Sequence, residues 1–211
     1  MTKTAEQIQK ELEKPFLKEV NGVFYPDFYW RVSHSYEDNQ SKTGRSALMV
    51  PYIDARHVYG RLNDVVGVNW AKQTTAFLDG AKCTISIKID GKWIERDGMS
   101  GQTKIEPEKG AESKSAVRAG VPWGIGAYLY SIGNVTLPAK IESVNGGRAS
   151  AQPYDKTGKV LLFTKESVSD YINMRYSIPA MKFAELTKAL SESEINELKP
   201  ELTKLWNCLK K

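Results

Sequence analysis

The sequence is poor in the residues that build disulfide frameworks and metal sites. Of its 211 residues, two are cysteine (Cys83 and Cys208) and two are histidine (His34 and His57). Neither cysteine lies near another cysteine or a histidine at metal-ligand spacing, and the histidines form no HxxH or HExxH pair. We therefore expect free thiols in a reducing cytoplasm, and neither a metal nor another cofactor.

Long apolar runs are lacking as well. No stretch approaches the roughly 20 consecutive apolar residues of a membrane helix, and the N-terminal residues lack the apolar region of a signal peptide. Hydrophobic residues make up 41% of the chain and charged residues 26%, which is typical of a globular domain. The sequence therefore predicts a cytoplasmic protein with no membrane association.

The spacing of apolar residues predicts an α+β fold. The first elements are, in order, an amphipathic helix at 3–19 that bends or ends at Pro15, a turn at 21–22, a strand at 23–32, a polar loop or hairpin tip at 34–46 and a short strand at 48–52. A second helix follows, with Asp54 as its N-cap and Gly67 as its stop.

Three Asp-Gly pairs indicate an antiparallel meander in the middle of the chain. Predicted strands at 70–78, 83–89 and 92–96 are followed by Asp79-Gly80, Asp90-Gly91 and Asp97-Gly98, respectively. Beyond the meander, we expect a helix at 106–120, loops with a minor hairpin at 134–160, and charged helices from about Lys165. The predicted architecture is a small antiparallel sheet with a helix packed on it and flanking helices.

The distribution of charge favours a polyanionic ligand. Lys and Arg number 30 against 25 Asp and Glu, a net charge of +5. The basic residues cluster in two groups: Arg31, Lys42, Arg45, Arg56 and Arg61, and then Lys104, Lys109, Lys114 and Arg118. Such clusters neutralise phosphates. Aromatic residues lie between them, and an exposed one can stack on a base; these are Tyr25, Tyr29, Trp30, Tyr36 and Tyr52. Trp30, Trp70 and Trp123 are expected in the core, whereas for Tyr36 and Tyr52 a core position and a stacking role are about equally expected.

Two other readings stay open. Asp97, Glu112 and Lys114 resemble the Asp…Glu-x-Lys set of Mg²⁺-dependent nucleases, although here the Glu-x-Lys falls in a predicted helix and not in a strand.

The third hypothesis is a basic module whose helical tail docks a partner protein. Its apolar residues are Phe183, Leu186, Leu190, Ile195, Leu198 and Leu205. Gly124-Ile125-Gly126 could suggest a phosphate-binding loop, but no Gly-Lys-Ser/Thr follows it. We therefore interpret these glycines as sites of close helix packing.

Several blocks resemble one family. These are Trp30-Arg31-Val32, the run from Tyr52 to Trp70, Arg96-Asp97-Gly98, Lys109-Gly110, Arg118-Ala119 and the run from Trp123 to Tyr130. Their order, spacing and residue types are similar to the phage Sak-type branch of the Rad fifty-two recombination proteins, across roughly residues 24–133.

The resemblance implies an antiparallel β-β-β-α core that assembles into rings or helical filaments. It implies a homo-oligomer that binds single-stranded DNA and anneals complementary strands in recombination and repair without ATP, and that is not an enzyme. The expected division is an annealing and oligomerisation domain at 1–165 and a helical extension at 166–211. Phage origin would place the protein in the host cytoplasm, with a single-strand binding protein or a phage exonuclease as a further partner.

The candidate DNA-binding residues combine charge clustering with the resemblance. They are Arg31, Tyr52, Arg56, Arg61, Lys104, Lys109, Lys114 and Arg118. Arg31 and Tyr52 match groove positions of the family, and Lys109 and Arg118 match its groove helix. For Arg56 and Arg61, salt bridging is an equal alternative to DNA contact. Val117, Pro122 and Ala127 replace cations common in relatives, which is expected to weaken binding, while Lys114 restores one positive charge.

Overall fold

The computed structural model describes residues 3–20, 23–102, 106–143, 149–162 and 164–173, which form two compact units. Of these residues, unit 1 contains 3–16, 53–102 and 106–128. Unit 2 contains 17–20, 23–52, 129–143, 149–162 and 164–173. Both units are therefore assembled from segments that are far apart in the sequence.

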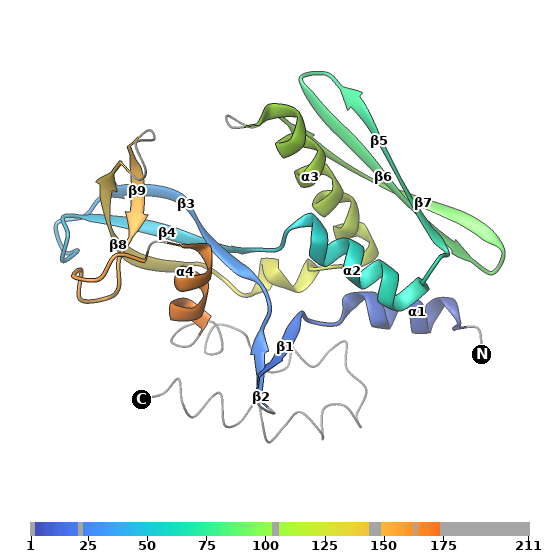
Figure 1. The fold of residues 1–211 in the computed structure, drawn as a ribbon, viewed down its shortest axis with the longest axis horizontal. Helices are drawn as coiled ribbons and strands as arrows, with labels where there is room; N and C mark the ends of the chain where they lie inside the picture. Colours follow the sequence, from blue (N-terminus) through green and yellow to red (C-terminus); the bar gives the residue numbers. More distant parts are fainter. Residues whose placement is uncertain (1–2, 21–22, 103–105, 144–148, 163, 174–211) are drawn as a thin grey trace. The chain divides into compact units, whose positions relative to one another are not determined.

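Unit 1 is a three-stranded antiparallel sheet with helices. Its elements are α1 (Ala5–Glu13), α2 (Ala55–Val66), β5 (Trp70–Phe77), β6 (Gly80–Ile89), β7 (Lys92–Gly101), α3 (Pro107–Gly120) and the 3-10 turn η1 (Val121–Trp123). The strands lie in the order β5-β6-β7, and α3 packs on β6 and β7 (Figure 1). The expected meander and its helix are thus present.

The core of unit 1 follows from alternation along the central strand. Ala81, Cys83, Ile85 and Ile87 of β6 are buried, while the residues between them are not. Small residues of α3 face this strand, and a β-carbon at Gly98 would lie 2.1 Å from the backbone nitrogen of Ala119. Gly98 therefore permits close packing of the helix. The prediction that Asp97-Gly98 ends the third strand is wrong, since β7 continues to Gly101.

Unit 2 is built on a four-stranded antiparallel sheet. Its elements are β1 (Leu17–Val20), β2 (Val23–Pro26), β3 (Tyr29–Glu37), β4 (Arg45–Tyr52), β8 (Val135–Glu142), β9 (Ser150–Pro153) and α4 (Lys165–Ile172); the 3-10 turn η2 (Ala127–Ser131) precedes β8. The sheet has the order β3-β4-β8-β9, and β1 and β2 form a separate hairpin. Helix α4 contacts β3 (Figure 1).

Trp30 joins the sheet of unit 2 to α4. Its indole nitrogen donates to Asn173 Oδ1 at 2.8 Å, and its backbone nitrogen donates to Ser169 Oγ at 3.0 Å. Trp30 and Trp123 are both almost fully buried, as expected, whereas Trp70 is half-buried and stacks on Tyr59.

The α+β class with antiparallel sheets is confirmed, but several boundaries differ from the sequence predictions. The first helix ends at Glu13, before Pro15, and residues 17–20 form a strand. The segment predicted as a loop or hairpin tip at 34–46 is the tip of the β3–β4 hairpin, but the tip is shorter, because β3 extends to Glu37 and β4 begins at Arg45. The minor hairpin predicted within 134–160 is present, because β8 and β9 pair antiparallel, but β8 also pairs with β4 as part of the larger sheet.

Some predictions fall outside the described residues. These are the turn at Asn21-Gly22, the position of Lys104, and the helical tail beyond residue 173. The predicted start of helix near Lys165 agrees with α4. The domain division at residue 165 stays a prediction. No helix in the described part of the chain is long and apolar enough to cross a membrane.

Candidate nucleic-acid interface

Arg31 and Tyr52, both expected to bind DNA, lie together in unit 2. The Arg31 guanidinium carbon is 5.8 Å from the centre of the Tyr52 ring. The Tyr52 ring is 5.7 Å from that of Tyr29, and Lys165 Nζ lies 3.9 Å from the centre of the Tyr29 ring. We call these four residues the cation–tyrosine cluster. Two cations on two tyrosine rings are a combination that suits both phosphates and bases.

Strand pairing explains how the cation–tyrosine cluster forms. Tyr29 lies opposite Tyr52 and Arg31 lies opposite Val50, so these side chains share one face of the sheet. The buried residues Trp30 and Met49 occupy the other face. Alternation along the two strands therefore separates a core face from a face that carries the cluster.

The charge of Arg31 is available to a ligand. Its side chain is exposed, and it forms no ion pair with any carboxylate in the described part of the chain. Lys165 has an exposed carboxylate, Glu166, at 3.7 Å. Exposed pairs of this kind are weak, so phosphate contact would cost little.

Helix α3 carries three of the predicted cations. Lys114 and Arg118 are exposed, one turn apart, on the side of the helix away from its buried alanines. Arg118 donates to the backbone oxygen of Met99 at 2.7 Å, while Lys114 forms no ion pair among the described residues. Lys109 is paired with Glu106 at 3.2 Å. Lys114 and Arg118 are therefore the stronger phosphate-binding candidates on α3.

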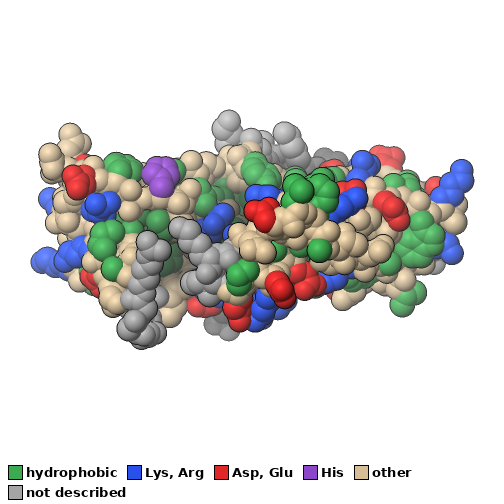
Figure 2. Space-filling model, turned by 90° about the horizontal axis from the view of Figure 1, so that it is seen from above, with side chains coloured by type: hydrophobic (Ala, Val, Ile, Leu, Met, Phe, Trp, Pro, Cys, Tyr) green, Lys and Arg blue, Asp and Glu red, His purple; other side chains and the backbone are tan. Residues whose placement is uncertain are grey.

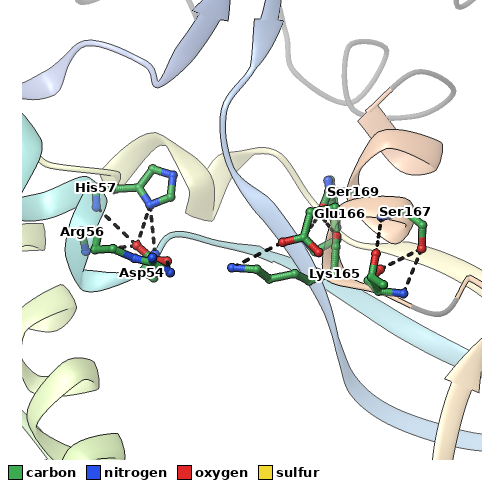
Figure 3. A network of polar contacts seen from close by, with 9 residues as sticks. Asp54, Arg56, His57, Lys165, Glu166, Ser167 and Ser169 are labelled. Carbon is green, nitrogen blue, oxygen red and sulfur yellow. Dashed lines mark hydrogen bonds and ion pairs between the residues drawn. The ribbon is translucent and has the colours of Figure 1, made fainter. Parts of the chain in front are cut away.

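Arg56 is tied to the cap of α2. Asp54 accepts from the backbone nitrogens of Arg56 and His57, and its other carboxylate oxygen lies 3.2 Å from the Arg56 guanidinium (Figure 3). Burial raises the pKa of Asp54, but the hydrogen bond and charge of His57 and the charge of Arg56 outweigh it, so the pKa is below its ordinary value. The Arg56 side chain is 83% exposed, and its salt bridge is with Asp54, two residues away. Salt bridging was one of the two roles predicted for Arg56, the other being DNA contact.

Arg61 is engaged in holding α1 in unit 1. Its guanidinium donates to the backbone oxygens of Glu11, Leu12, Lys14 and Pro15, at 2.6–3.4 Å. It also lies 4.4 Å from the centre of the Phe16 ring. These oxygens belong to the last turn of α1 and to the two residues after it, where carbonyls lack helical partners. The pKa of Arg61 is below its ordinary value, because burial lowers it by more than nearby Tyr128, Asp64 and Glu11 raise it. The contacts assign Arg61 a structural role.

Asp97 and Glu112, which the nuclease hypothesis would place at one metal site, lie on opposite faces of the β5-β6-β7 sheet. Asp97 is on the outer face, where its hydrogen bonds with Lys82 and Thr84 hold its pKa below the ordinary value. Glu112 is on α3, on the inner face, 2.7 Å from Lys72 Nζ, and this bond raises the pKa of Lys72. Asp97 and Glu112 cannot share a metal in this arrangement, and no candidate metal cluster is found among the described residues.

Two members of the cation–tyrosine cluster, Tyr29 and Lys165, were not among the binding residues selected from the sequence, although Tyr29 was noted among the aromatic residues. Tyr29 lies in the aromatic run that was assigned to a strand, and its pairing with Tyr52 depends on the register of β3 and β4. Lys165 is far away in the sequence and joins the cluster through α4. On the face drawn in Figure 2, basic and acidic side chains are interspersed. No single large basic patch is visible on this face.

Comparison of the chain with protein-family models, curated proteins and solved structures finds no match in any of the three.

Proposed function

We propose that this protein binds single-stranded DNA and anneals complementary strands without ATP, as a homo-oligomer of the Rad fifty-two type. The observation that carries the proposal is the contact between Arg31 and Tyr52 on adjacent strands. Both residues were selected from the sequence as groove residues, and the fold places them side by side on the face opposite the core. A guanidinium beside an aromatic ring can hold a phosphate while the ring contacts a sugar or base.

The arrangement of unit 1 supports the same proposal. The order β5-β6-β7-α3 is the β-β-β-α order that the resemblance implies, and Lys114 and Arg118 lie on the exposed side of the helix. Annealing needs only that strands are concentrated, extended and screened from mutual repulsion, because base pairing supplies the free energy. Lys114 and Arg118, which have no acidic partner in the part of the chain that the structure describes, meet that need.

The first test measures annealing directly. Two complementary oligonucleotides that carry a donor and an acceptor dye are mixed in EDTA without nucleotide, with and without the protein. We expect the protein to raise the annealing rate at least about tenfold, because cations screen phosphate repulsion. Intact product strands on a denaturing gel, in EDTA and in Mg²⁺, are expected for an annealing protein and contradict a nuclease.

A matched pair of variants ties the activity to the interface. Arg31→Ala is expected to slow annealing, whereas Lys10→Ala is not, although both remove one positive charge. Lys10 is exposed on α1 and paired with Glu6. Equal losses in both variants would mean that only net charge matters, and equal retention would remove Arg31 from the interface.

A further inference from the structure

The face of β3 that carries Arg31 continues as a row of aromatic side chains. Strand pairing places Tyr29 opposite Tyr52, Arg31 opposite Val50, His34 opposite Leu48 and Tyr36 opposite Ser46. The four partners are alternate residues of β4 and therefore share one face. Tyr29, Arg31, His34 and Tyr36 lie along this face, and we call them the β3 row.

A register shift between Val32 and His34 creates the β3 row. Regular alternation after Arg31 would place Ser33 and Ser35 on its face, and His34 and Tyr36 on the core face. The extra residue at Ser33 has no partner on β4, as in a β-bulge, and it brings His34 and Tyr36 to the side of Arg31. Bulges often re-aim side chains at functional sites.

The outer half of the β3 row is open to solvent. Tyr36 is 43% exposed, His34 is exposed, and their ring centres are 6.1 Å apart. The row ends at Asp38, whose carboxylate accepts from Ser46 Oγ at 2.6 Å. Exposed aromatic rings leave apolar surface in contact with water, which is unfavourable. Next to a cation, such rings form a surface that suits flat, anionic ligands.

We propose that the β3 row is a stacking surface on which successive bases of single-stranded DNA lie, with Arg31 and Lys165 holding the phosphates. This inference rests on the proposed function and extends it from phosphate binding to base contact. Every base offers a π-face, so such a surface binds without sequence preference. Stacking leaves the hydrogen-bonding edge of each base free, which is compatible with annealing to an incoming strand.

The spacing of the β3 row favours an extended strand over a duplex. The ring centres of His34 and Tyr36, which are two residues apart on β3, are separated by 6.1 Å. Stacked bases in a duplex are separated by about 3.4 Å, roughly half that distance. Neighbouring bases can therefore contact neighbouring rings only when the strand is stretched and unstacked. A base-paired duplex cannot present its base faces to the row at all.

The test separates base contact from phosphate contact. Fluorescence anisotropy compares a dT strand of about 20 nucleotides with an abasic strand of equal length, both in EDTA. We expect the wild-type protein to bind the dT strand at least about fivefold more tightly, because stacking contributes about 1–3 kcal/mol per base. Tyr36→Ala should remove most of that preference and leave the affinity for the abasic strand unchanged.

The variants have matched controls. Tyr36→Phe keeps the ring and should keep the preference, and Tyr130→Ala should have no effect, since Tyr130 is 79% exposed but lies outside the β3 row. Arg31→Ala should weaken binding of both strands equally. Circular dichroism before and after heating checks that each variant is folded.

The outcomes distinguish the inference from the function on which it rests. Equal wild-type affinity for the dT and abasic strands, or a full preference in Tyr36→Ala, overturns the stacking surface and leaves phosphate-based DNA binding in place. Absence of binding to either strand overturns both.

Discussion

Arg31 and Arg61 show how two similar residues can serve opposite purposes in one chain. Arg61, in unit 1, donates to four backbone oxygens at the end of α1 and packs on Phe16. Arg31, in unit 2, is exposed beside Tyr52 and has no ion pair among the described residues. Both were candidates for DNA binding from charge and position. The difference shows that the hydrogen-bond donors of a helical arginine can be used in intramolecular contacts. An arginine on the face of a sheet opposite the core can instead bind a ligand.

The largest effect expected from this comparison is on stability. Arg61→Ala removes charged hydrogen bonds and leaves carbonyls at the end of α1 without partners, so it should lower the free energy of unfolding by about 2–3 kcal/mol. Arg31→Ala should change it by less than about 0.5 kcal/mol. Urea denaturation of both variants measures the contrast, and similar stabilities would mean that the contacts of Arg61 contribute nothing.

The next effect is on DNA affinity. Arg31→Ala should weaken binding of single strands about tenfold and reduce the slope of log affinity against log salt by about one unit. The loss should be the same for all base compositions, because a phosphate contact carries no sequence information. Anisotropy at several salt concentrations gives both quantities. An unchanged slope would exclude a phosphate contact at Arg31.

Arg118 extends the comparison to α3. Arg118→Ala should also weaken binding for all sequences and lower the salt slope, while leaving the oligomer intact. A loss of oligomers would indicate that its hydrogen bond to Met99 holds α3 on β7. Mass photometry of the variant without DNA distinguishes the two roles.

The smallest effect concerns the cap of α2. Asp54→Asn keeps an accepting oxygen for the backbone but removes the charge, so it should cost less than the roughly 1 kcal/mol of a lost cap. The pKa of Asp54 is lowered in the folded protein, so its charge stabilises the fold above the unfolded pKa of about 3.9. That contribution is lost as pH falls through the folded value. Thermal melts should show that the melting temperatures of the wild-type protein and Asp54→Asn become equal as the pH is lowered. A difference in melting temperature that stays constant down to about pH 3 would contradict a stabilising charge on Asp54.

Local sequence signals were sufficient for most of unit 1. The Asp54 cap, the stop at Gly67 and two of the three Asp-Gly turns were read correctly, because each depends on a few neighbouring residues. Asp97-Gly98 misled the prediction. The same glycine that favours a turn is needed there for close packing of α3, and only the tertiary fold shows which use applies.

Unit 2 was harder to predict because its sheet depends on distant pairing. Strand β4 pairs with β8, so residues near 47 meet residues near 137. The bulge at Ser33 also hides the β3 row, since counting alternate residues assigns His34 and Tyr36 to the wrong face. Arg31 and Tyr52 could be found from the sequence, but Tyr29 and Lys165 required the register and the position of α4.

Mass photometry of the purified protein tests the central proposal most directly. The protein is measured alone and with an unlabelled single strand of about 60 nucleotides in EDTA, which is long enough to contact several subunits of an oligomer. The proposal predicts large discrete oligomers that take up the strand, with Arg31→Ala forming the same oligomers but taking up less DNA. A monomer that ignores the strand would contradict it.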